Sequence, residues 1–390
     1  MDEISLYIHI PFCNSKCYYC DFNSGKYSAE IQKKYFNSLK NEILQNKVKN
    51  KIKSIYFGGG TPSAADEKNI VEILNLIKNN FDVKNDAEIT IECNPNSLDE
   101  NKLTCFRDAG FNRLSLGVQT TNKNSLKTIG RIQEKNELKN YKKIIKNNLK
   151  FAKKLNFNIS ADLMLGLPKN NYFNLISDIF FLNKYCNHIS VYMLTLYEGT
   201  KLFEQYKNES LENKIIKEYK LSQKLLKLLK FEQYEISNFA KAKSYSKHNL
   251  NYWACGQYLG FGLSAHSYLS NYRYFNVSSM QAYFNNYENI NFGKEIKSYK
   301  EIIDQNLKLK NNVEKLTKRQ QAEEYIMLNL RLKDGLNLTE FKQKFYDLKL
   351  IKQNEIKQLL NKKLIKFNGE KIVLTKKGIL FENQVSVNLM

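Results

Sequence analysis

The stretch that decides the fold is residues 13–20, CNSKCYYC, which directly follow an apolar segment ending at Phe12. This stretch holds Cys13, Cys17 and Cys20, close enough together for three thiols to reach one metal centre. Thiolates are preferred protein ligands of both iron–sulfur clusters and zinc. A closed zinc or cubane site takes four protein ligands, so three thiols on a [4Fe–4S] cluster would leave one iron open to a small molecule.

Two other interpretations of these thiols compete with the cluster. A zinc knuckle stays open but less favoured, because it needs a fourth ligand and Asp21 is the only local candidate. A disulfide framework is disfavoured, because seven cysteines are an odd and sparse number for 390 residues and no secretory signal precedes them. The other four thiols are expected to be ordinary buried cysteines: Cys93, Cys105, Cys186 and Cys255.

Composition and charge indicate which other classes of protein can be set aside. The chain contains no run of eighteen apolar residues, and residues 1–10 lack the layout of a signal peptide, so we expect a soluble, cytoplasmic protein. Its net charge of +22 would suit nucleic acid, anionic lipid or a polycarboxylate. Because lysine and asparagine are abundant throughout and no basic run alternates with aromatic residues, the charge predicts no nucleic-acid partner.

Short β-rich segments alternate with helical ones along the first half of the chain. Six strands are predicted, at residues 5–10, 53–57, 87–92, 113–118, 158–163 and 188–193. Three helices are predicted between the first four strands, at residues 29–47, 68–79 and 99–109. This alternation predicts an α/β fold with a parallel sheet and right-handed crossovers, here an open or partial (β/α)6 barrel.

Polar and glycine residues gather where these strands end. Residues 58–62, GGGTP, follow the second strand, and Glu92, Gln119 and Asp162 stand at the ends of the next three. In parallel α/β folds ligands bind at the carboxyl ends of the strands. Glycine lets the backbone approach a ligand directly. The pattern therefore predicts one cavity that these groups share with the thiols.

Together these motifs resemble the radical S-adenosylmethionine (SAM) superfamily and, within it, the oxygen-independent coproporphyrinogen III dehydrogenases and the related haem chaperones. The similarity covers most of the chain and is carried by LYIHIPFC (6–13), GGGTPS (58–63), ECNP (92–95), RLSLGVQ (113–119) and DLMLGLP (162–168). The resemblance implies a radical SAM barrel in which three cysteines hold a [4Fe–4S] cluster. SAM would chelate the open iron, and the reduced cluster would cleave its sulfonium bond to give a 5′-deoxyadenosyl radical.

The resemblance implies no catalytic side chain, but it assigns eight residues to the cluster and cofactor: Tyr7, Gly59, Gly60, Thr61, Glu92, Gln119, Arg131 and Asp162. Glu92 suits the cationic ammonium and sulfonium groups, Arg131 suits the carboxylate, and Asp162 suits a polar contact with the nucleoside. Two alternatives stay open: Glu92 as the cap of a following helix, and Arg131 as an exposed cation at a helix end.

Two departures separate the branches of this family. The dehydrogenases carry a further thiol where this chain has Phe22. They also have a longer leader, whereas Met1 lies twelve residues before Cys13 here. Both features resemble the haem chaperone branch.

A third feature resembles the same branch. Residues 248–253, HNLNYW, match its H-N-x-x-Y-W signature, which is associated with haem. His248 is a suitable iron ligand, and the tyrosine and tryptophan offer flat apolar faces to a porphyrin. The alternative is that His248 orders a loop while Trp253 packs in the core. His266, within GFGLSAHS (260–267), is a second candidate ligand.

The end of the chain predicts a separate small domain. Thr317 and Gln320 form a capping-box pattern before a helix to Arg331, two short helices follow, and Asn368-Gly369 predicts a hairpin. This order resembles a winged helix, which we expect to be a docking module rather than a nucleic-acid reader. The predicted division is a barrel core at 1–235, a connecting region with the haem motif at 236–310, and a winged-helix-like domain at 311–390.

The sequence thus predicts a protein that binds a [4Fe–4S] cluster, SAM and haem and delivers haem to haem-requiring respiratory proteins. We expect a monomer or weak homodimer that associates transiently with the inner membrane face. The alternative is a coproporphyrinogen III oxidase of haem biosynthesis, which converts propionates to vinyl groups by radical decarboxylation. A radical modifier of RNA is a third hypothesis, which the charge permits and no motif supports.

Overall fold

Six parallel strands form the centre of the computed structural model, which describes residues 3–132, 134–242, 244–288, 296–309 and 311–390. The strands are β1 (Ile4–Ile10), β2 (Ile52–Gly59), β3 (Val83–Cys93), β4 (Arg113–Gln119), β5 (Asn158–Leu165) and β6 (His188–Met193). They pair in chain order, so their carboxyl ends open at one edge of the sheet. The predicted α/β barrel is confirmed.

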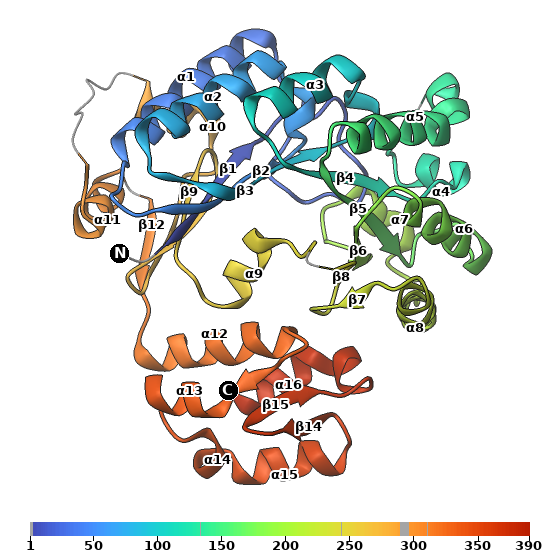
Figure 1. Cartoon of the computed structure of the whole chain (residues 1–390), viewed down its shortest axis with the longest axis vertical. Helices are drawn as coiled ribbons and strands as arrows, with labels where there is room; N and C mark the ends of the chain where they lie inside the picture. Colours follow the sequence, from blue (N-terminus) through green and yellow to red (C-terminus); the bar gives the residue numbers. More distant parts are fainter. Residues whose placement is uncertain (1–2, 133, 243, 289–295, 310) are drawn as a thin grey trace.

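Helices cover the outer face of these strands (Figure 1). They are α1 (Ala29–Gln45), α2 (Glu67–Asn80), α3 (Glu100–Ala109), α4 (Lys123–Thr128), α5 (Lys135–Lys154), α6 (Tyr172–Asn183), α7 (Lys201–Tyr206) and α8 (Glu212–Leu228). Short 3₁₀ helices, η1 (Pro62–Ala64) and η2 (Pro95–Ser97), follow β2 and β3. Within the described ranges, no helix has the length and apolar character needed to cross a membrane.

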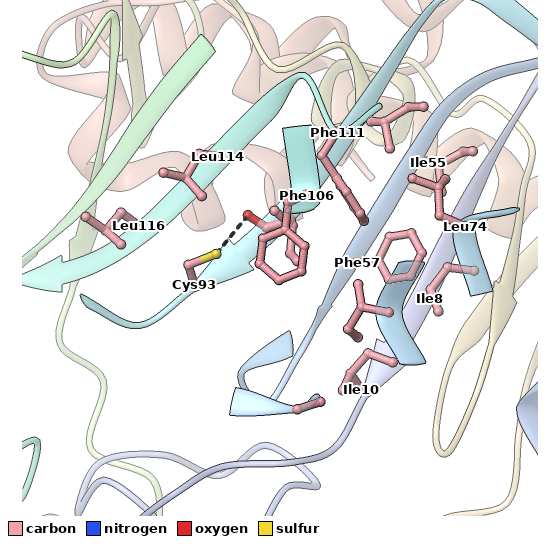
Figure 2. Close-up of a cluster of buried hydrophobic side chains, with 14 of the residues drawn as sticks. Ile8, Ile10, Ile55, Phe57, Leu74, Cys93, Phe106, Phe111, Leu114 and Leu116 are labelled. Atoms are coloured by element: carbon pink, nitrogen blue, oxygen red, sulfur yellow. Dashed lines mark hydrogen bonds between the residues drawn. The ribbon is translucent and has the colours of Figure 1, made fainter. Parts of the chain in front are cut away.

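The core between the sheet and these helices is apolar and closely packed. Figure 2 shows Ile8 of β1 and Phe57 of β2 facing Leu74 of α2, with Phe106 of α3 against Phe111. Burial of such side chains contributes roughly 1.5–3 kcal/mol each. This packing holds the strand ends, and the loops that leave them, in a fixed arrangement.

Shorter strands extend the sheet at both edges. Beyond β1 lie β9 (Tyr258–Phe261), β10 (His266–Leu269), β11 (Tyr272–Phe275) and β12 (Asn312–Lys315), and beyond β6 lie β8 (Asn238–Ala240) and β7 (Glu232–Gln233). A Cβ at Gly260 would lie 2.0 Å from the His266 carbonyl oxygen, so only glycine allows β10 to fold back there. The predicted connecting region at 236–310 therefore contributes strands to the main sheet.

Three further helices accompany these edge strands: α9 (Lys247–Trp253), α10 (Met280–Tyr287) and α11 (Tyr299–Lys308). Helix α9 lies on the inner side of the sheet, between the sheet and the C-terminal domain (Figure 1).

The C-terminal domain has its own core and a second, three-stranded sheet. Its elements are α12 (Lys318–Arg331), β13 (Leu336–Asn337), α13 (Leu338–Lys344), α14 (Leu348–Ile351), α15 (Gln353–Asn361), β14 (Ile365–Asn368), β15 (Lys371–Leu374), η3 (Gly378–Phe381) and α16 (Glu382–Leu389). Thr317 and Gln320 form the predicted capping box. The hairpin turn falls one residue later than expected, because Asn368 pairs with Lys371 and Gly369 takes the left-handed φ of +57°.

A buried carboxylate joins the helix layer to the sheet edge. Glu42 of α1 accepts hydrogen bonds from the Gly262 backbone N–H at 2.8 Å, the Asn276 side-chain amide at 2.5 Å and the Tyr283 hydroxyl at 2.5 Å. Burial raises the pKa of Glu42 to about 7, although the three donors oppose this shift. One side chain thus fastens α1 to the segment after β9 and to α10.

We expect Glu42→Ala to lower the free energy of unfolding by roughly 3–5 kcal/mol, because three buried donors lose their acceptor. Urea denaturation followed by circular dichroism measures the loss. Glu72→Ala is the matched control, since Glu72 forms only a surface ion pair with Lys40, worth about 0–1 kcal/mol. Equal effects of the two substitutions would contradict this role for Glu42.

Candidate functional site

A cavity of about 470 Å³ opens where the parallel strands end, and we call it the strand-end cavity. Ten of the predicted site residues line it: Cys13, Cys17, Cys20, Gly59, Gly60, Thr61, Glu92, Gln119, Arg131 and Asp162. They come from the ends of β1 to β5 and from the loop after α4, so the parallel topology brings them together.

The three thiols lie in the loop that leaves β1. The Cys13 sulfur lies 3.6 Å from the Thr61 hydroxyl oxygen. A Cβ at Gly60 would lie 3.0 Å from that sulfur and 2.8 Å from the Phe12 carbonyl oxygen, so the glycine leaves space beside the thiol. In the described part of the chain, no three Cys, His, Asp or Glu side chains are grouped tightly enough to hold a single metal ion.

Arg131 lies beside the thiols rather than at an exposed helix end. It donates one hydrogen bond to the Cys17 sulfur at 3.7 Å and another to the Gly117 carbonyl. A Cβ at Gly117 would lie 2.8 Å from the guanidinium, so glycine in β4 makes room for it. The Arg131 Nε is buried and has no partner among the described residues. This leaves a donor available for an anionic group such as a carboxylate.

Two half-buried carboxyl groups line the same cavity as the arginine. Glu92 accepts hydrogen bonds from the Tyr56 hydroxyl at 2.6 Å and the Gly59 N–H at 3.2 Å. Asn94, not Glu92, caps the helix η2 that follows. Burial raises the pKa of Glu92 to about 7 and that of Asp162 to about 6. A cationic ligand would favour the ionised form of both.

Buried polar atoms without partners provide a test of the cofactor fit. Within the described residues, the Gln119 Oε1 and Asp162 Oδ1 atoms are buried and make no hydrogen bond, like the Arg131 Nε. Such atoms are costly in a folded protein unless a ligand satisfies them. SAM carries an ammonium, a sulfonium, a carboxylate and hydroxyls, so these acceptors, carboxyls and the guanidinium fit its chemistry.

Two predicted site residues lie outside this cavity. Tyr7 projects from the inner face of β1, where its hydroxyl lies 3.1 Å from the His9 Nδ1. His248 is buried between α9 and β2, and its ring stacks on Tyr56 with centroids 5.0 Å apart. Both of its ring nitrogens are engaged, Nδ1 with the Ser54 hydroxyl at 2.9 Å and Nε2 with the Tyr252 hydroxyl at 2.8 Å. The structure therefore gives His248 an ordering role and leaves neither nitrogen open to a metal.

A second cavity, of about 580 Å³, lies among β1, α9, the β9–β11 strands and α12. We call it the aromatic cavity, because six aromatic side chains line it: Tyr7, Phe22, Tyr252, Trp253, Tyr258 and Tyr268. His266 and Arg273 also line it, and Glu324 and Leu328 of α12 supply a wall from the C-terminal domain. Sequence patterns pointed to the HNLNYW segment and to His266 of β10, but not to the contributions of β11 and α12.

A short segment after the thiols is common to both cavities. Asp21 and Phe22 line the strand-end cavity and also the aromatic cavity. Asn23 anchors this segment, because its amide donates to the Ser264 hydroxyl at 2.8 Å and to the Ser278 carbonyl at 2.9 Å. The Phe22 side chain is 64% exposed, so it serves as a cavity wall and not as core.

Comparisons with known proteins agree with this geometry. The model of the radical SAM superfamily matches residues 7–182, and that of the HemN C-terminal domain matches residues 316–381. The haem chaperone HemW of Buchnera aphidicola (subsp. Schizaphis graminum) is 39% identical over 68% of this chain and 70% of its own length. HemW of Bacillus subtilis is 32% identical over 87% of this chain and 86% of its own.

A solved structure shows the same fold. Coproporphyrinogen III oxidase (HemN) of Escherichia coli, described as a radical SAM enzyme, superposes with a TM-score of 0.80 over 100% of this chain and 90% of its own. Its sequence identity of 21% supports the shared fold alone.

We expect the affinity for SAM to rise about tenfold between pH 6 and pH 8, because a carboxyl group with a pKa near 7 must ionise to hold a cation. Calorimetric titration of cluster-loaded protein measures the dissociation constant, and proton release on binding provides a second readout. Glu92→Gln should bind more weakly and lose most of this dependence, with Asp162 supplying the remainder. A wild-type affinity that does not change with pH would contradict the assignment of Glu92.

Proposed function

Because this chain belongs to the HemW family of radical SAM proteins, we propose that it is a haem chaperone. It binds haem and delivers it to haem-requiring proteins, respiratory enzymes among them. It acts in the cytoplasm as a monomer or weak homodimer and meets its acceptors in transient contact with the inner membrane face.

The aromatic cavity is the observation that carries this proposal. A porphyrin is a flat apolar ring with anionic propionates on one edge, and aromatic faces are the side chains best suited to pack on it. Tyr252 and Trp253 of the HNLNYW segment line this cavity together with Tyr258. Its volume lies within the usual range for small-molecule sites, roughly 300–1,000 Å³.

The cluster and SAM belong to the strand-end cavity in this proposal. Cys13, Cys17 and Cys20 hold the [4Fe–4S] cluster. The open iron of this cluster would bind SAM, and the reduced cluster would supply the electron that cleaves it. Gly59 and Thr61 present the glycine-rich loop to the amino-acid part of SAM. Separate cavities let the protein hold SAM and haem at the same time.

The alternative function is oxidation of coproporphyrinogen III. That reaction requires the tetrapyrrole to reach the SAM side of the thiol loop, because the radical abstracts a propionate hydrogen. Phe22 occupies the position where the dehydrogenases are expected to carry a further thiol. The aromatic cavity lies on the other side of this phenylalanine, which supports cargo binding over turnover.

The test is a parallel assay of anaerobically reconstituted protein. We expect stoichiometric haem binding, transfer of haem to an apo-haemoprotein, and no protoporphyrinogen from coproporphyrinogen III with reductant and SAM. Trp253→Ala should weaken haem binding and leave SAM binding unchanged, because that residue lines the aromatic cavity and not the strand-end cavity.

Asp162→Ala is the matched control and should weaken SAM binding while leaving haem binding unchanged. Multiple turnover of coproporphyrinogen III, or the absence of haem binding by the wild-type protein, would overturn the proposal.

A further inference from the structure

The chain has four histidines, all within the described residues, and three of them are already engaged at both ring nitrogens. His9 contacts the Tyr7 hydroxyl at 3.1 Å and the Asn23 carbonyl at 3.3 Å. His188 contacts the Ser160 hydroxyl at 2.7 Å and the Tyr234 hydroxyl at 2.8 Å.

His248 is bound in the same way, as described above. Each of these three rings is buried, so ligation to a metal would break internal hydrogen bonds and leave their partners unsatisfied.

His266 differs from the other three in its exposure and in its hydrogen bonding. It begins β10, is exposed to solvent and lines the aromatic cavity. Its ring stacks on Phe275, the residue paired with it in β11, with centroids 4.8 Å apart and planes at 24°. Within the described chain neither ring nitrogen makes a hydrogen bond, so the stacking orients the ring and both nitrogens stay available.

The geometry points to His266 as the axial ligand of haem iron in the aromatic cavity, with Arg273 contacting a haem propionate. This inference rests on the proposed function, because it names the ligand and the counter-charge at that same site. Neutral imidazole is a common protein ligand of haem iron.

Arg273 is placed to meet the anionic edge of the same ligand. It lies opposite Tyr268 in the β10–β11 pair, two residues along from the pair formed by His266 and Phe275, so it shares their face of the hairpin. Its guanidinium lies 2.7 Å from the carboxylate of Glu324 on α12. A propionate must therefore share this arginine with Glu324, which makes the C-terminal domain part of the site.

Cys255 is the competing iron ligand that lines this cavity. The variant Cys255→Ser therefore tests this thiol as the alternative ligand.

The inference is tested by absorption and electron paramagnetic resonance spectra of the full-length protein titrated with ferric haem. We expect His266→Ala to shift the Soret band and weaken haem binding about tenfold or more, and added imidazole to restore the wild-type spectrum. His188→Gln is the control and should leave the haem spectrum unchanged, because His188 is engaged at both nitrogens and does not line this cavity.

The ion pair between Arg273 and Glu324 gives a second test, because its two partners should change the haem affinity in opposite directions. Arg273→Ala should weaken haem binding, whereas Glu324→Gln should strengthen it by releasing the arginine, an outcome that mere damage to the fold would not produce. Circular dichroism of each variant checks that the fold is kept.

Three results would overturn the inference. One is a haem spectrum and affinity that do not change in His266→Ala. Another is a Soret shift in Cys255→Ser alone, which would identify the Cys255 sulfur as the iron ligand. The third is weaker binding in both Arg273→Ala and Glu324→Gln. Failure of the wild-type protein to bind any haem is a different result, because it would remove the proposed function itself.

Discussion

Strand β1 is hydrogen-bonded in parallel on both sides, to β2 and to β9, and both cavities depend on this double pairing. Tyr7 lies opposite Tyr56 on one side and Gly260 on the other. Since side chains alternate along a strand, the isoleucines of β1 face the helices while Tyr7 and His9 face inward. A slip of one residue would exchange the two faces and bury polar rings among the helices. The same strand therefore delivers the thiol loop to one cavity and an aromatic wall to the other.

Hydrogen bonding differs sharply between the strand-end cavity and His248. At the strand-end cavity, buried atoms of Gln119, Arg131 and Asp162 have no partner in the described chain, and each such atom costs roughly 1–3 kcal/mol. A ligand that pairs with them offsets this cost. His248 shows the opposite situation, since both of its nitrogens and its backbone N–H are paired, the last with Glu88 at 3.0 Å. The hydrogen bonds of this motif residue thus hold α9 against β2 and β3.

Sequence patterns predicted the parallel strands because buried strands are long apolar runs, and they predicted the strand-end residues because parallel topology places those ends together. The edge strands β7 to β12 were missed, since two to four residues carry too little periodicity to be distinguished from loops. The orientation of His248 could not be predicted from the sequence either, because its partner Ser54 lies 194 positions away in the chain. The same holds for His266, whose availability follows from what its neighbours leave unpaired.

The segment shared by the two cavities has a thermodynamic consequence. Asp21 and Phe22 form part of the boundary of both, and Asn23 fixes them to the chain beyond β9. If a ligand in one cavity displaces Asp21 and Phe22, it changes the binding free energy of a ligand in the other cavity. Binding free energies around a closed cycle must sum to zero, so any factor by which the first ligand alters the affinity of the second equals the factor in the reverse direction. Any coupling carried by these three residues would therefore be equal in both directions.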